Sequence, residues 1–182
     1  MESGPALILR TLDRHLTAPG EVRLFGGAAF VLGYGRDRTT DDADLLLDDH
    51  ECQVLIDTAG FGEAIEATNQ ELEDRGLYLT HVFGPEQQVL SPGWREACRQ
   101  VNLQGLSKLT VSCLGPVDLA LTKMGRADDA DLADIEFLLR TQQLERSAFR
   151  DAIEVAMIPP EYAELFAVAR PKVLALLMAA PR

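Results

Sequence analysis

The sequence predicts a mixed α/β fold followed by a helical region, on three observations. Short strand-like segments alternate with helical patterns over residues 1–114. Beyond that point, apolar residues recur at helical spacing almost to the end of the chain. The 182 residues are 47% hydrophobic and 25% charged, which is enough apolar material for a buried core. We therefore expect an α/β core at residues 1–114 and a helical region at residues 115–182 packed on it.

The first four elements follow from periodicity and turn residues. Residues 6–16 carry apolar side chains at helical spacing, and a Pro-Gly pair ends that helix. A short strand is expected at residues 22–25, and two glycines separate it from a short, buried helix at residues 28–34. Alternation predicts a second strand at residues 43–47, with its carboxylates on one face and its apolar residues on the other.

The middle of the chain is less regular. Residues 62–75 have a helical pattern, and Gly76 is placed to cap that helix. Residues 53–56 form a run too short to assign. Residues 94–103 predict either a strand or a helix, whereas the alternation in residues 109–114 predicts a strand.

Helical patterns dominate the C-terminal third. Pro116 suits a first helical turn and opens an apolar stripe. Further helices are expected at residues 131–142, 147–157 and 161–178, and two consecutive prolines separate the last two. Together these elements predict a small mixed sheet flanked by helices, followed by a C-terminal helical region.

Charge and cysteine content exclude several classes of protein. The formal net charge of −12 argues against general electrostatic binding of nucleic acid, although one small site is enough to bind a nucleotide. Three widely spaced cysteines favour a reducing compartment, and no apolar run approaches the roughly 20 residues that span a bilayer. We expect a cytoplasmic protein with no membrane partner. The three histidines share no zinc-ligand spacing, which indicates ordinary surface or partly buried residues: His15, His50 and His81.

Two short features together indicate metal and phosphate chemistry. Asp42 and Asp44 lie two residues apart on one strand face, with Cα atoms roughly 6.6 Å apart. That separation lets two carboxylates converge on metal ions roughly 3.5–4 Å apart. Gly26 and Gly27 lie between a strand and a helix, where backbone N–H groups approach a phosphate closely.

The residues that carry these features are LFGGAA at 24–29 and RTTDDADL at 38–45. They resemble the nucleotidyltransferase superfamily that includes DNA polymerase beta, and especially a small bacterial branch that includes abortive-infection nucleotidyltransferase toxins. The resemblance implies a nucleotidyltransferase fold, a nucleoside triphosphate substrate, and Mg²⁺ or Mn²⁺ held by Asp42 and Asp44. It also implies nucleotide contacts from the glycine pair and from Arg38 and Thr40.

A second segment extends the resemblance to the helical region. The sequence reads DLALTKMGR at 118–126 and DLADI at 131–135, which matches a Lys and Arg followed by Asp-x-x-Asp in that branch. Lys123 and Arg126, three residues apart, are expected on one helix face that meets a triphosphate. The match implies catalytic roles for Lys123 and Asp131, although acids at a helix N-terminus also stabilise the helix without any substrate.

One element of the superfamily pattern is missing from this sequence. Relatives usually supply a third carboxylate from a neighbouring strand. Asp57 is a candidate only if residues 54–56 form a strand, and the later strand expected near Asn102 offers an amide instead. Without a third acid, catalysis is weakened or reassigned, for instance to Asp131.

Two functions remain in view. The first is metal-dependent transfer of a nucleoside monophosphate from a triphosphate to an acceptor hydroxyl, with release of pyrophosphate. An RNA end, a protein hydroxyl and a small molecule all stay open as acceptors. The alternative is a catalytically weak or inactive nucleotide-binding or regulatory module of a toxin–antitoxin-like system, with a cognate protein partner.

Overall fold

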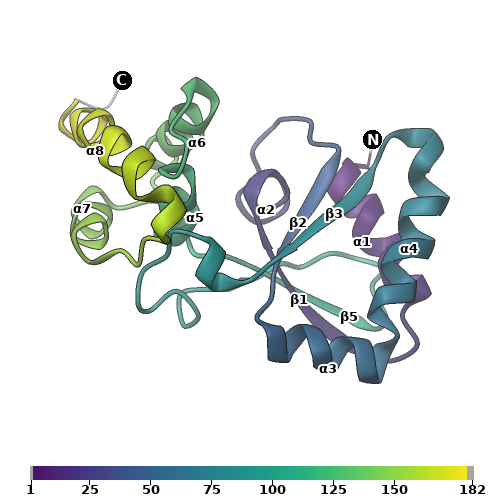
Figure 1. The fold of residues 1–182 in the computed structure, drawn as a ribbon. Coiled ribbons are helices and arrows are strands. Elements are labelled where there is room, and N and C mark those ends of the chain that lie inside the picture. Colours follow the sequence, from purple (N-terminus) through teal and green to yellow (C-terminus); the bar gives the residue numbers. More distant parts are fainter. Residues whose placement is uncertain (1, 180–182) are drawn as a thin grey trace. The chain divides into compact units, whose positions relative to one another are not determined.

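A five-stranded mixed sheet forms the centre of the first of two compact units (Figure 1). The computed structural model describes residues 2–179, except for the side chain of Thr80. The sheet has the order β3-β2-β1-β5-β4, in which β1 is antiparallel to β2 and parallel to β5, while β3 is parallel to β2 and β4 antiparallel to β5. The strands are β1 (Gly20–Phe25), β2 (Asp42–Leu46), β3 (Tyr78–Phe83), β4 (Arg99–Gln100) and β5 (Leu109–Cys113).

Four helices pack around this sheet. Helix α1 lies against α4 and β2, helix α2 against β1 and β2, and helix α3 against β1 and α4. Their apolar side chains and those of the central strands form a core in which Ile8, Leu24 and Phe30 are fully buried. The helices are α1 (Gly4–His15), α2 (Gly26–Tyr34), α3 (Asp49–Ala59) and α4 (Phe61–Leu72), and a 3₁₀ turn, η1 (Glu73–Arg75), follows α4.

Most of the predicted elements of this unit are confirmed, with one correction and one addition. Helix α3 includes residues 53–56, a run too short to assign from the sequence. It forms because Asp48 and Glu51 make a capping box at its start and Gly60 ends it in a left-handed conformation. Asp57 therefore lies on a helix, and the condition for its role as third carboxylate fails. Strand β3 was not predicted, although its alternating residues lie between Gly76 and Gly84.

A buried carboxylate fixes the start of β5 to helix α1. Asp13 is 3% exposed, and it accepts hydrogen bonds from the backbone N–H groups of three consecutive residues: Ser107, Lys108 and Leu109. Burial raises the pKa of Asp13, but these hydrogen bonds outweigh burial and hold the pKa below its ordinary value. The ionised carboxylate thus stabilises this junction above the ordinary aspartate pKa and loses that contribution in acid.

The second unit is helical and contains Pro85–Cys98 together with the chain from Leu114 onward. Helix α5 packs against α6 and α7, and α7 packs against α8. These elements confirm the predicted helical region: α5 (Pro116–Lys123), α6 (Asp129–Arg140), α7 (Arg146–Val155), η3 (Pro160–Tyr162) and α8 (Ala163–Met178). Among the described residues, no helix combines the length and apolar character needed to cross a membrane.

The segment Pro85–Cys98 joins the second unit through backbone contacts. Leu90 and Met157 exchange two backbone hydrogen bonds, and the Ser91 N–H donates to Asp118 at 2.7 Å. The segment contains one 3₁₀ turn, η2 (Pro85–Gln87). Of residues 94–103, where a strand or a helix was expected, only the two residues of β4 form a strand. Asn102 lies outside that strand. The boundary after residue 114 and the packing of the helical region on the α/β core stay predictions.

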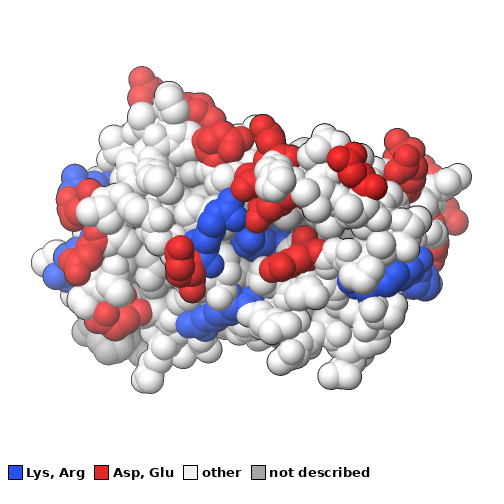
Figure 2. Space-filling model, turned by 90° about the horizontal axis from the view of Figure 1, so that it is seen from below, with Lys and Arg blue, Asp and Glu red and all other residues white. Residues whose placement is uncertain are grey.

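Charge on the surface agrees with the acidic composition. On the face that Figure 2 shows, Lys and Arg side chains are interleaved with Asp and Glu side chains.

Candidate active site

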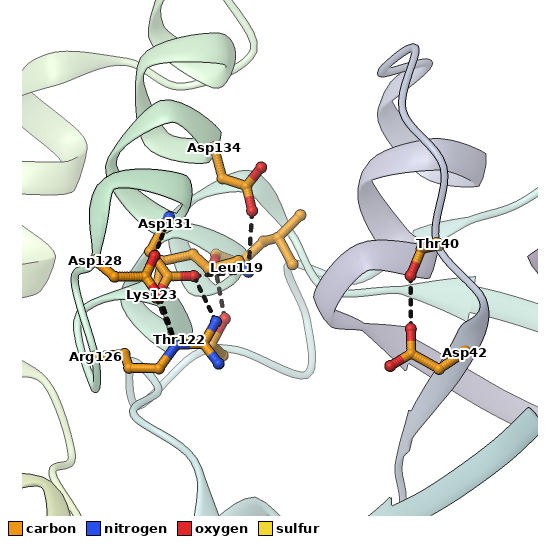
Figure 3. A network of polar contacts seen from close by, with 9 residues as sticks. All are labelled: Thr40, Asp42, Leu119, Thr122, Lys123, Arg126, Asp128, Asp131 and Asp134. Atoms are coloured by element: carbon orange, nitrogen blue, oxygen red, sulfur yellow. Dashed lines mark hydrogen bonds and ion pairs between the residues drawn. The ribbon is translucent and has the colours of Figure 1, made fainter.

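Strand β2 presents the two carboxylates that the sequence singled out. Asp42 and Asp44 are both partly exposed, whereas Ala43 and Leu45 between and beyond them are fully buried. The alternation of the strand thus directs both acids away from the core on one face. The Thr40 hydroxyl donates a 2.6 Å hydrogen bond to Oδ1 of Asp42, which fixes one of the two carboxylates (Figure 3).

The glycine pair lies against these same residues. Gly26 has a φ of +62°, and a Cβ atom placed on it would lie 2.8 Å from Oδ2 of Asp44. A Cβ atom on Gly27 would lie 2.8 Å from Oγ1 of Thr40. Only residues without a side chain allow the start of α2 to approach β2 this closely. The structure therefore brings the glycine pair, Thr40 and the two carboxylates together in the first unit.

Strand β3 adds His81, which the sequence predicts to be an ordinary surface or partly buried histidine. His81 pairs in register with Asp44, and its Nδ1 lies 4.0 Å from Oδ1 of Asp44. The alternating pattern of β3 indicates a strand, but no local signal fixes the register that places His81 opposite Asp44. Arg38, which the resemblance implied as a nucleotide contact, lies exposed in the loop between α2 and β2.

The predicted residues of the helical region form a cluster within the second unit. Nζ of Lys123 lies 3.1 Å from Oδ1 of Asp131 and 3.0 Å from Oδ2 of Asp134. The two carboxylates are 2% and 1% exposed, and the lysine side chain is 11% exposed. Arg126 also binds Asp131, through Nε at 2.9 Å and Nη2 at 3.0 Å (Figure 3).

The expectation that Lys123 and Arg126 share one helix face is wrong. Helix α5 ends at Lys123, and Arg126 lies in the turn before α6, where Ala127 has a positive φ of 48°. Lys123 and Arg126 nevertheless lie in the same cluster, because both bind the Asp131 carboxylate. The turn is also held by Asp128, the N-cap of α6, whose side chain accepts a hydrogen bond from the Asp131 N–H.

Two cations offset the charge of the buried Asp131 carboxylate in this cluster. Burial alone raises the pKa of the Asp131 carboxyl, but the hydrogen bond from Arg126 and the charge of Lys123 outweigh burial and lower that pKa. Asp131 is therefore ionised and neutralised within its own unit. The catalytic roles implied for Lys123 and Asp131 stay predictions.

The donor atoms of the first unit fit a magnesium-type site with few protein ligands. Within residues 2–179, no group of three or more His, Cys, Asp or Glu side chains is arranged to hold a metal ion. Mg²⁺, however, is commonly held by one or two carboxylates, with substrate phosphates and water completing its shell. Asp42 and Asp44 offer such a pair, and the missing Cβ of Gly26 makes room for the Asp44 carboxylate beside the start of α2.

Comparison with known proteins identifies one family. The family model described as "Nucleotidyltransferase of unknown function (DUF6036)" matches residues 9–156. This range contains the glycine pair, both carboxylates, His81 and the Lys123 cluster. Comparisons with curated proteins and with solved structures gave no significant match.

Proposed function

Because the chain belongs to the DUF6036 family of nucleotidyltransferases of unknown function, we propose that it transfers a nucleoside monophosphate from a triphosphate to an acceptor hydroxyl. The observation that carries this proposal is the contact between the Gly26 turn and the Asp44 carboxylate. In that contact, a helix N-terminus suited to phosphate lies beside carboxylates suited to a divalent cation.

The residues of the first unit have distinct tasks in this reaction. Asp42 and Asp44 hold Mg²⁺ or Mn²⁺, which supplies Lewis-acid stabilisation of the phosphate charge. Thr40 fixes Asp42, and the backbone of Gly26 and Gly27 seats the triphosphate. Arg38 contributes positive charge from the exposed loop.

The chemical step is a displacement at the α-phosphorus. The acceptor oxygen forms a bond to the α-phosphorus, the bond from that phosphorus to the bridging oxygen breaks, and pyrophosphate leaves. The hydroxyl proton passes to solvent. The acceptor class stays open between an RNA end, a protein hydroxyl and a small molecule, and a cognate protein partner remains part of the proposal.

A second candidate function rests on one observation from each unit. Lys123 and Asp131 neutralise each other there, and the residue opposite Asp44 is a histidine rather than a third carboxylate. Both observations favour a nucleotide-binding or regulatory module with little turnover.

The deciding experiment uses nucleoside triphosphates labelled at either the α-phosphate or the γ-phosphate. The protein is incubated with each of the four ribonucleoside triphosphates and Mg²⁺ or Mn²⁺, together with total RNA, cell lysate or no added acceptor. Label from the α-phosphate is expected to move to an acceptor, and label from the γ-phosphate is expected to appear in pyrophosphate. Bound nucleotide without any transfer supports the second candidate function instead.

Substitution of Gly26 tests the contact that carries the proposal. Gly26→Ala and Gly35→Ala both place a side chain at positive φ, at +62° and +67°, and each is expected to lower stability by about 1 kcal/mol. Only at Gly26 does the new Cβ meet Asp44, since nothing lies within 4 Å of one at Gly35. Displacing the carboxylate is expected to reduce transfer about a hundredfold. Equal transfer rates in the two variants, at equal stability, would argue against the contact as part of the site.

A further inference from the structure

The pairing of β3 with β2 shifts register beside the two carboxylates. Asp42 pairs with Tyr78, whereas Asp44 pairs with His81. Strand β3 therefore contains one more residue than β2 between these two pairs. Such bulges occur often beside active sites, where they redirect a side chain. Here the shift places an imidazole, rather than the preceding residue, opposite Asp44.

Aromatic contacts orient the His81 ring. The ring lies 5.2 Å from that of Phe83, which packs edge to face on Phe25 at 5.3 Å. Phe25 is 7% exposed and is the N-cap residue of α2, directly before the glycine pair. The same aromatic packing thus holds both the imidazole and the start of α2. The His81 side chain is nevertheless 63% exposed, so its ring nitrogens are accessible to an ion from solvent.

We propose that His81 and Asp44 bind the same divalent cation, which makes the site a mixed nitrogen and oxygen site. This inference rests on the proposed function. Two ligand atoms that each lie about 2.1 Å from one ion are at most about 4.2 Å apart, and Nδ1 of His81 and Oδ1 of Asp44 are separated by 4.0 Å. Rotation of the exposed His81 side chain toward Asp44 would bring both atoms to the same ion.

The nitrogen ligand has a consequence for the choice of metal. Mg²⁺ is a hard cation that prefers oxygen ligands and octahedral geometry. Imidazole suits transition metals, and Mn²⁺ accepts carboxylate, water and nitrogen ligands together. The site is therefore selective for Mn²⁺ over Mg²⁺, in contrast to a site in which the neighbouring strand supplies a third carboxylate.

Binding of Mn²⁺ alone tests the inference without any need for turnover. Electron paramagnetic resonance titration gives the dissociation constant, and pulsed measurements on protein labelled with ¹⁵N-histidine report whether an imidazole nitrogen is bonded to the ion. His81→Phe keeps an aromatic ring against Phe83 but removes both nitrogens. We expect this variant to bind Mn²⁺ at least about tenfold more weakly and to lose the nitrogen coupling.

Two further variants sharpen the result. His50→Phe makes the same replacement at an exposed histidine on α3 and is expected to bind Mn²⁺ like the wild type. His81→Asp converts the site to oxygen ligands only and is expected to shift the preference toward Mg²⁺, measured by competition against Mn²⁺. An unchanged dissociation constant in His81→Phe, or the absence of nitrogen coupling in the wild type, overturns the inference.

Failure of this inference is distinguishable from failure of the proposed function. If Mn²⁺ binding is lost in Asp44→Asn but unaffected in His81→Phe, the carboxylates hold the ion and only the role of His81 is overturned. If the wild type binds Mn²⁺ through His81 but transfers no nucleotide, the metal site stands and the proposed transfer reaction is overturned.

Discussion

Simultaneous replacement of Asp42 and Asp44 by asparagine is expected to reduce nucleotide transfer by about a thousandfold or more. The variant removes the anionic oxygens that hold the cation, and losses on this scale follow when groups that stabilise developing charge are removed. The fold is expected to stay intact or become slightly more stable, because two neighbouring negative charges on β2 are removed. Asparagine at position 42 keeps an oxygen acceptor for the Thr40 hydroxyl.

A matched control separates this effect from the change in net charge. Asp57→Asn with Asp74→Asn also removes two negative charges from the first unit, at exposed positions on α3 and η1. Transfer of α-phosphate label by this control is expected to equal that of the wild type. If Asp42→Asn with Asp44→Asn transferred label at the wild-type rate, the two-carboxylate site would be wrong.

Replacement of Lys123 by methionine is expected to lower the free energy of unfolding by about 3–5 kcal/mol, measured by denaturant titration. Methionine retains the length of the lysine stem, so the loss is not a packing defect. It arises because Asp131 and Asp134, which are 2% and 1% exposed, lose the cation that both contact. Removing one partner of a buried ion pair leaves an uncompensated charge in a poorly solvated position.

The loss of unfolding free energy in Lys123→Met depends on pH. In the wild type, the lowered pKa of Asp131 means that its contribution to stability is present above the ordinary aspartate pKa and is lost as pH falls through the folded value. Without Lys123, the Asp131 carboxyl loses one of the cations that lower its pKa, so it binds protons more readily. The difference in stability between the variant and the wild type is therefore expected to be smallest in acid and largest at neutral pH.

Two controls identify the buried charge as the cause. Arg170→Ala breaks an exposed ion pair with Glu154 in the same unit, and it is expected to change stability by at most about 1 kcal/mol. Adding Asp131→Asn and Asp134→Asn to Lys123→Met removes the whole set of buried charges and is expected to restore most of the lost stability. If Lys123→Met were as stable as the wild type at neutral pH, Lys123 would be available for the triphosphate contact that the resemblance implied.

The sequence by itself was sufficient for elements whose signals are local. Neighbouring residues alone predicted strand β1, the glycine pair and helix α2, because the signals for a glycine turn and for a helix each lie within a few positions of the sequence. The helices of the second unit were readable for the same reason. The placement of Asp42 and Asp44 on one face required only the two-residue period of a strand.

Tertiary structure alone decided which distant residues meet. His81 lies beside Asp44 because β3 pairs with β2 in a shifted register, and nothing in either segment alone specifies that register. Lys123 and Asp131 meet because the turn between α5 and α6 folds back on itself, with Ala127 at positive φ. Residues 53–56 belong to helix α3 and not to a strand, because the caps at Asp48 and Gly60 stabilise the helix and a run of four residues specifies a strand only weakly. Contacts between distant segments depend on sheet register and packing of the whole unit, and a local pattern does not encode either.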